Sequence, residues 1–471
     1  MAGSARWASL LLMASLGAAL LAGATRAPLL GQQVLQATGR RPAGLAATIA
    51  TRAAALESGA PAVPPAIAGA RAPAESATDA AVRQMQDRLG ANPADPMRDA
   101  AYAQLGTLYL QKARETGDPT YYVKAEEALQ RSLTLAPANA AAVLGMGWLH
   151  LARHQFADAL EWGERARTLS PFSSAPYGVI GDALIELGRY AEATEAIQAM
   201  VDRRPDVTSL ARVSYVRELH GDLPGALYAM WQAVTAGNDA TESTQWARVQ
   251  LGHLYFLAGD LDAAEGAYRQ ALAYLPDYPH GLAGLAKVAA ARGRLKEASA
   301  LYERTLSIAP LPEYAIALGE VYRAAGDASG AARQDALVRA IARLQRAGGV
   351  DLDSELILFE VDQAKDGQEI EAALDAARRQ YDRRPASIHA AGALAWALYR
   401  AGRAEEALPY ARQALRLGTN DPVTLFHAGA IAAAAGERPA ARDYLAGALA
   451  RNPRFHPRLA PEARRLLEEL R

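Results

Sequence analysis

One spacing, of 34 residues, recurs along most of the chain from residue 76 onwards. Its marker is an alanine that follows a short acidic or polar stretch, and most successive markers lie 33 or 34 residues apart. A fixed period of this length indicates a repeat architecture, in which each copy packs on its neighbours. The marker alanines are Ala81, Ala125, Ala159, Ala193, Ala226, Ala264, Ala298, Ala331, Ala373, Ala407 and Ala441.

Two other residue types keep the same period and predict that each unit is a pair of helices. A glycine lies five residues before most markers, where it allows a tight turn between helices without a steric penalty. A proline lies twelve residues after many markers, where it ends the second helix because it lacks an N–H and restricts its predecessor. The turn glycines are Gly188, Gly221, Gly259, Gly293, Gly326, Gly402 and Gly436.

Large apolar residues between these signals recur at helical spacing, as in Leu251, Leu254 and Tyr255. One helix pair cannot bury its apolar face alone, but stacked copies can. The unit that runs from Trp246 through Gly259 and Asp260 to Pro276 closely resembles the tetratricopeptide repeat (TPR) family, and the resemblance covers about residues 76–455. It implies an all-α, right-handed superhelical solenoid of stacked helix-turn-helix repeats.

The regularity of the units predicts five segments. Residues 1–24 are a signal peptide or membrane anchor, and residues 25–75 are an Ala/Pro-rich flexible linker. Residues 76–347 form a capping helix with about seven repeats, residues 350–455 form about three more, and residues 456–471 form a capping helix. Long spacing and Gly348-Gly349 predict a bend or hinge near 348–353.

The amino-terminal segment has the three parts of an export signal. Arg6 precedes an apolar run from Leu10 to Leu21, and the small residues 22–24 form a cleavage site. Alternatively, residues 7–24 are just long enough to cross a bilayer and anchor the chain. Both alternatives predict an exported protein in the periplasm, at the cell surface or outside the cell.

Composition and motifs exclude several classes of function. The chain has 50 basic and 51 acidic residues, so it lacks the basic surplus of a nucleic-acid-binding protein. It has no cysteine, which excludes disulfides, thiolate metal sites and thiol catalysis. No nucleophile elbow, phosphate-binding loop or paired-histidine zinc motif occurs. We therefore expect no enzyme activity, no cofactor and no metal site.

The resemblance also implies a ligand groove. In the TPR family, the first helix of each repeat lines the concave surface, and four of its positions face the ligand. Transferred to this sequence, these positions give a groove with aromatic anchors and an acidic middle. The candidate groove residues are Trp148, Asp182, Glu186, Trp246, His253, Phe256, His280, Glu320, Arg323, Trp396 and Tyr399.

The sequence thus predicts a non-catalytic scaffold of the cell envelope, which binds an extended protein or peptide segment in the concave groove. An alternative is a carbohydrate-binding or carbohydrate-processing accessory module, because aromatic side chains such as Trp246 are expected near carboxylates such as Glu320. A further alternative is that the aromatic residues pack between repeats as core. The carboxylates are harder to explain by packing, since buried carboxylates need partners.

Overall fold

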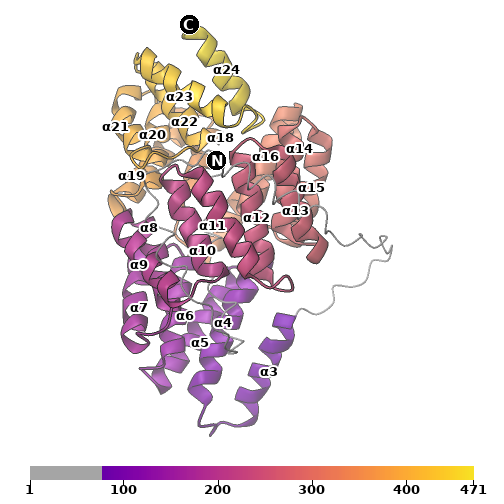
Figure 1. Ribbon diagram of the computed structural model, residues 1–471, viewed down its shortest axis with the longest axis vertical. Helices are drawn as coiled ribbons and strands as arrows, with labels where there is room; N and C mark the ends of the chain where they lie inside the picture. Colours follow the sequence, from indigo (N-terminus) through magenta and orange to yellow (C-terminus); the bar gives the residue numbers. More distant parts are fainter. Residues whose placement is uncertain (1–76) are drawn as a thin grey trace.

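A computed structural model describes residues 77–471 (Figure 1). The predicted signal or anchor segment 1–24 and the linker 25–75 lie outside the described residues. The described part forms 22 helices and contains no strand, which confirms the all-α repeat solenoid. None of these helices combines the length and the apolar character needed to span a bilayer.

The helices α4 to α23 pair in chain order into ten units, each with a first and a second helix that pack closely on one another. A single helix lies at each end of the array: α3 packs on α4, and α24 packs on α22 and α23. The bounds are α3 Ala77–Ala91; unit 1, α4 Arg98–Thr116 and α5 Thr120–Leu135; unit 2, α6 Ala140–Ala152 and α7 Phe156–Leu169; unit 3, α8 Ala175–Glu186 and α9 Tyr190–Arg203; unit 4, α10 Val207–Leu219 and α11 Leu223–Ala236; unit 5, α12 Glu242–Leu257 and α13 Leu261–Tyr274; unit 6, α14 Pro279–Ala291 and α15 Leu295–Ile308; unit 7, α16 Pro312–Ala325 and α17 Ala328–Ala347; unit 8, α18 Ser354–Gln363 and α19 Gly367–Arg383; unit 9, α20 Ile388–Arg400 and α21 Ala404–Ala414; unit 10, α22 Pro422–Ala434 and α23 Arg438–Arg451; and α24 Leu459–Glu469.

The turns between paired helices adopt the conformation that the glycines predict. All seven turn glycines have φ between 73° and 81°, a backbone region that residues with a Cβ rarely adopt. Unit 2 has His154 at this position with φ 59°, and it is the one non-glycine residue with positive φ in the described chain. In unit 5, Asp260 then starts the second helix, because its side chain accepts a hydrogen bond from the backbone N–H of Ala263 at 3.0 Å.

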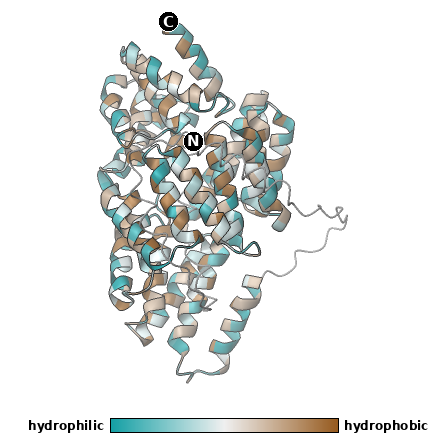
Figure 2. Ribbon diagram, viewed as in Figure 1, coloured by the Kyte–Doolittle hydropathy of each residue, from teal (hydrophilic) through white to brown (hydrophobic). Residues whose placement is uncertain are grey.

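Buried apolar residues form five clusters spread along residues 77–471, so the core is distributed instead of central. Figure 2 accordingly shows hydrophobic and hydrophilic residues mixed within most helices. In unit 5 the fully buried ring of Tyr268 packs on Gly252, where a Cβ would lie 2.5 Å from the ring. The same ring packs on Gly284 of unit 6, so small residues allow both helices to approach it.

The irregular spacings have local explanations. The extra residues of unit 1 lengthen its first helix to 19 residues, and α5 begins after Gly117, Asp118 and Pro119. The extra residues of unit 7 lengthen α17 to 20 residues. The predicted hinge at 348–353 coincides with the connection between α17 and α18.

The superhelix completes one turn, or coil, after about six units. The second coil then lies against the first. Arg153, after α6, donates from Nε to the carbonyl of Gly348 at 3.1 Å, and its own carbonyl accepts from the N–H of Asp351 at 2.9 Å. Further along, Asn420 donates to the carbonyl of Gly221 at 2.6 Å, and Asn452 donates to that of Phe256 at 2.7 Å. The paired residues are 195 to 199 positions apart.

We call this line of contacts the axial seam: the turns at residues 117, 153–155, 188, 221 and 256–259 against the connections at residues 310–311, 348–351, 384–388, 418–420 and 451–452. It joins units 1–5 to the loops that follow units 6–10, so the second coil lies directly on the first (Figure 1). The inner face of the solenoid is therefore enclosed over this stretch by the chain itself.

Candidate functional site

The first helices of units 5, 6 and 7 build a cavity of about 170 Å³ on the inner face, which we call the inner cavity. Trp246, His253 and Phe256 of α12 lie on one side. The residues that follow α23 border the cavity, including Phe455 and His456, because the second coil returns over the first at this point. Its remaining lining includes Gln250, His280, Lys287, Tyr302, Glu313, Tyr314, Glu320, Glu355 and Arg454.

Five of the eleven sequence-predicted groove residues line this one cavity: Trp246, His253, Phe256, His280 and Glu320. Arg323, one helical turn beyond Glu320, is paired with Glu320 and Asp335. The others lie in different units. Trp148 is buried in α6, Asp182 and Glu186 are buried in α8, and Trp396 and Tyr399 stack on each other in α20 with ring centroids 4.9 Å apart.

The inner cavity also contains residues that the sequence analysis did not identify. Gln250 lies four residues after Trp246 and three before His253, so helical spacing alone places it on the same face. Phe455 and His456 gave no such signal. They follow the last repeat, and only the pitch of the superhelix brings them to units 5–7.

The predicted acidic middle of the groove is neutralised from within the chain. Asp182, with no exposed side-chain surface, binds Arg212 of the next unit through two hydrogen bonds of 2.7 and 2.5 Å. Burial raises the pKa of Asp182 to about 6, although the adjacent guanidinium opposes this shift. Glu186 pairs with Arg384 at 3.0 Å across the axial seam. These carboxylates therefore have internal partners.

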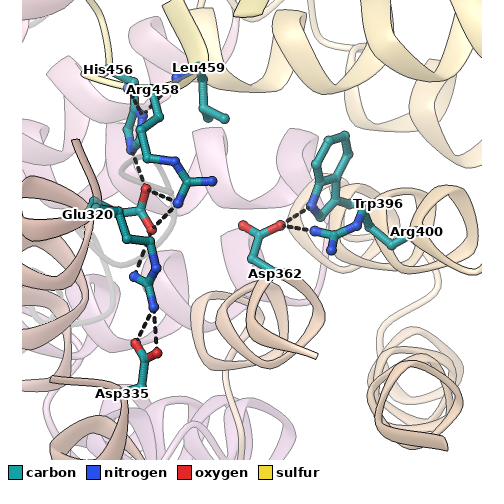
Figure 3. Close-up of polar contacts among 9 residues, drawn as sticks. Glu320, Asp335, Asp362, Trp396, Arg400, His456, Arg458 and Leu459 are labelled. Carbon is teal, nitrogen blue, oxygen red and sulfur yellow. Dashed lines mark hydrogen bonds and ion pairs between the residues drawn. The ribbon is translucent and has the colours of Figure 1, made fainter. Parts of the chain in front are cut away.

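Glu320 has partners on its own helix and in the segment that follows α23 (Figure 3). Arg458 donates to both of its carboxylate oxygens at 3.2 Å, and Arg323 donates at 3.1 Å. The imidazole Nε2 of His456 lies 3.8 Å away. Burial raises the pKa of Glu320, while Arg458 and Arg323 oppose the rise. This cluster holds the segment that follows α23 against α16.

A second cluster, also in Figure 3, lies further along the inner face. Asp362 of α18 accepts hydrogen bonds from Trp396 Nε1 and from Arg400, both at 2.8 Å. Burial raises the pKa of Asp362, and the bond from Trp396 opposes that rise. The indole of Trp396 stacks on His427 with centroids 3.9 Å apart. This aromatic residue is thus engaged by its own chain.

Two of the three histidines that line the inner cavity, His253 and His280, are paired with tyrosines. His280 Nδ1 lies 2.6 Å from the hydroxyl of Tyr314, and His253 Nδ1 lies 2.7 Å from that of Tyr268. Burial lowers the pKa of His280 to about 4 and lowers the pKa of His456 well below its usual value. Both imidazoles are neutral at pH 7. Within residues 77–471, no group of three or more His, Asp or Glu side chains is arranged to hold a metal ion.

The amino-acid sequence of this chain matches models of the tetratricopeptide repeat at residues 122–174, 175–207, 255–321 and 362–422. These stretches include helices on both sides of the axial seam and two of the first helices that line the inner cavity.

One relative is cellulose synthase operon protein C of Xanthomonas axonopodis pv. citri, which is 32% identical over 192 residues. The match covers 37% of this chain but only 12% of that protein, so this chain corresponds to a small part of the relative.

Several solved structures are similar to this chain at low identity. The human IFIT1 dimer with PPP-AAAA is 15% identical with a TM-score of 0.44, and the match covers 71% of this chain and 77% of that one. The Cut9–Hcn1 hetero-tetramer of the APC/C is 12% identical with a TM-score of 0.39 and coverages of 83% and 90%. The type IV pilus biogenesis factor PilW is 18% identical with a TM-score of 0.29 and coverages of 51% and 92%.

The period of the sequence, the ten helix pairs with their turn glycines, and the matches to repeat models agree with one another. The chain is a tetratricopeptide-repeat protein.

Proposed function

We propose that this protein is an exported, non-catalytic scaffold that binds a segment of a partner protein on the inner face of its superhelix, at the inner cavity. The observation that carries the proposal is the construction of that cavity. Three consecutive first helices contribute aromatic side chains to one concave site, and buried aromatic pockets are where protein partners place their anchor residues.

The internal pairing of the carboxylates argues against a basic partner segment. Asp182, Glu186 and Glu320 are each engaged by arginines of the same chain. A basic ligand would have to displace one of these arginines before it could bind the carboxylate, which costs binding free energy. The proposal therefore places the main binding contribution in the aromatic lining instead of in charge attraction.

A photo-crosslinking experiment tests the proposal. The photoreactive residue p-benzoylphenylalanine replaces Lys287, which lines the inner cavity, in the full chain produced in its native cells. The control carries the same residue in place of Arg269, whose side chain is 68% exposed on the second helix α13. We expect a protein adduct from position 287 and none from position 269. No adduct, or equal adducts from both positions, would contradict the proposal.

Export is tested separately, because residues 1–24 lie outside the described structure. A fusion of residues 1–76 to alkaline phosphatase, which is active only after export, should be active. Sequencing of the amino terminus of the mature protein then distinguishes cleavage after residue 24 from retention of an anchor. An inactive fusion with a stable, correctly sized product would contradict export.

A carbohydrate ligand is the second candidate. Two observations favour it: Trp246 and Glu320 line the same cavity, and a relative of part of the chain is a cellulose synthase operon protein. Calorimetric titration with cello-oligosaccharides checks this candidate. Measurable binding that Phe455→Ala weakens would support it, whereas no heat and no hydrolysis on a broader set of glycans would remove it.

A further inference from the structure

Gln250 lines the inner cavity and has a buried side-chain acceptor that receives no hydrogen bond. Its side chain is 5% exposed and lines the cavity, and its Oε1 atom has no hydrogen-bond partner. Several other buried polar atoms in residues 77–471 also lack a partner, but none of their residues lines the inner cavity. A buried acceptor without a donor is unfavourable, so a ligand that supplies an N–H or O–H would gain from it.

Five aromatic side chains line the same cavity as Gln250. Trp246, Phe256, Tyr302, Tyr314 and Phe455 all contribute to the lining. Aromatic rings attract one another in offset-stacked or edge-to-face geometry beyond the effect of area alone. The lining therefore favours a flat, polarisable group over an aliphatic one of the same size.

Two charged side chains of the lining, Glu320 and Lys287, are engaged by other residues of the chain. Glu320 is paired with Arg458 and Arg323, and the ammonium of Lys287 lies 4.4 Å from the centre of the Phe256 ring. His280 bonds Tyr314 and is neutral at pH 7, because burial lowers its pKa to about 4. A charged ligand group would lose its hydration and compete with these internal contacts. A neutral group does not carry that cost.

From these three features we infer that the inner cavity binds an aromatic side chain with a hydrogen-bond donor, and that this donor bonds Gln250 Oε1. Among the coded amino acids, tryptophan and tyrosine have this chemistry, whereas phenylalanine lacks the donor. The inference rests on the proposed function, since it names the residue type that the partner segment places in the cavity.

The test compares peptides that differ only at the donor. The probes are Gly-Gly-X-Gly-Gly peptides with blocked ends, in which X is tryptophan or its isostere β-(3-benzothienyl)alanine, where sulfur replaces the indole N–H. A second pair has tyrosine or phenylalanine at X. In NMR titrations of the full chain, we expect the donor-bearing member of at least one pair to bind about tenfold more tightly.

Two variants decide whether Gln250 is the acceptor. Gln250→Leu should remove the preference by weakening the donor-bearing peptide about tenfold, while binding of its isostere is unchanged. The matched control is Gln334→Leu, which removes another unpartnered Oε1 on α17, away from the inner cavity, and should keep the preference. Circular dichroism and thermal unfolding check that both variants are folded, and Gln250→Met replaces Gln250→Leu if the latter does not fold.

Three outcomes overturn the inference: equal binding within both peptide pairs, no binding of any probe at millimolar concentration, or a preference that persists without Gln250. The proposed function is judged by a different result. A partner captured at position 287 together with any of these outcomes would contradict only the inference, whereas failure of capture would contradict the proposed function itself.

Discussion

At the scale of single residues, the inner face is defined by how its buried charges are paired. The resemblance to the TPR family implied that Asp182, Glu186 and Glu320 face inwards, and they do lie on first helices. The partners of Glu186 and Glu320 could not be predicted, because Arg384 and Arg458 lie 198 and 138 residues away along the chain. Helical spacing from Trp246 and His253 would have identified Gln250, whereas no local sequence pattern marks Phe455.

The pair Asp182–Arg212 predicts a large and asymmetric response to mutation. Asp182→Ala leaves the guanidinium of Arg212 buried without a counter-charge, which should lower the free energy of unfolding by about 3–5 kcal/mol. Replacing both residues by leucine and methionine should recover much of this loss. Urea denaturation measures both values. The control is Glu192→Ala at the solvent-exposed pair Arg189–Glu192, which should change stability far less. Equal losses at the two sites would contradict the assignment.

His280 predicts a pH dependence with a defined sign. Its pKa falls from 6.5 to about 4 on burial, so between these values the unfolded chain binds a proton that the folded chain does not. Its contribution to stability is therefore complete above pH 6.5 and is lost as the pH falls towards 4. Between pH 7 and pH 5 the loss should be about 2 kcal/mol.

The comparison that isolates this contribution is His280→Gln, which has no titrating imidazole at that position. The variant should lose about 2 kcal/mol less than the wild type between pH 7 and pH 5, measured by urea denaturation. Tyr278, Tyr314 and Arg114 surround the imidazole and are retained in both proteins. An identical pH response of the two proteins would show that His280 titrates normally.

At the scale of secondary-structure elements, the sequence predicts most of what is observed. The period predicts the helix pairs, and the turn glycines predict the left-handed backbone conformation between the two helices. The period does not show which atoms surround each turn glycine, and these differ from one turn to another. Gly188 lies on the axial seam against the backbone of Ala386, whereas Gly402 has no neighbouring atom within reach of an added Cβ.

This difference predicts unequal costs for one substitution. Gly402→Ala meets only the penalty of a left-handed backbone, roughly 1–2 kcal/mol. Gly188→Ala meets the same penalty at a similar φ, and its Cβ also overlaps the carbonyl group of Ala386, so one coil must move away from the other. Thermal unfolding midpoints should therefore fall further for Gly188→Ala. A shift for Gly188→Ala that is equal to or smaller than that for Gly402→Ala would show that the two coils can separate at the axial seam without loss of stability.

At the scale of the whole molecule, the feature that the sequence could not predict is the axial seam. The number of units per superhelical turn depends on small rotations between neighbouring repeats, and these accumulate over about six units. A repeat pattern therefore predicts an open concave groove equally well as an enclosed one. The structure shows that the second coil lies on the first and that five predicted groove residues meet in one cavity bordered by the chain after α23.

Loosening the seam should expand the molecule without unfolding its repeats. Arg384→Ala removes the ion pair with Glu186 and the contact of the guanidinium with the Phe156 ring, and Asn420→Ala removes the hydrogen bond to Gly221. In small-angle X-ray scattering, the double variant should show a larger maximum dimension than the wild type, while circular dichroism reports the same helix content. Arg412→Ala, at an exposed pair within one coil, is the control and should scatter like the wild type. An unchanged profile for the double variant would contradict the seam's role.

The bonded coils also determine how the protein responds to tension. A solenoid whose turns are separate stretches gradually, because each hairpin rotates slightly against the next. Here Arg153, Asn420 and Asn452 fasten one coil to the other, so a pull on the two ends first loads these few bonds. We therefore expect the molecule to resist stretching up to a threshold force and to lengthen abruptly once these bonds break.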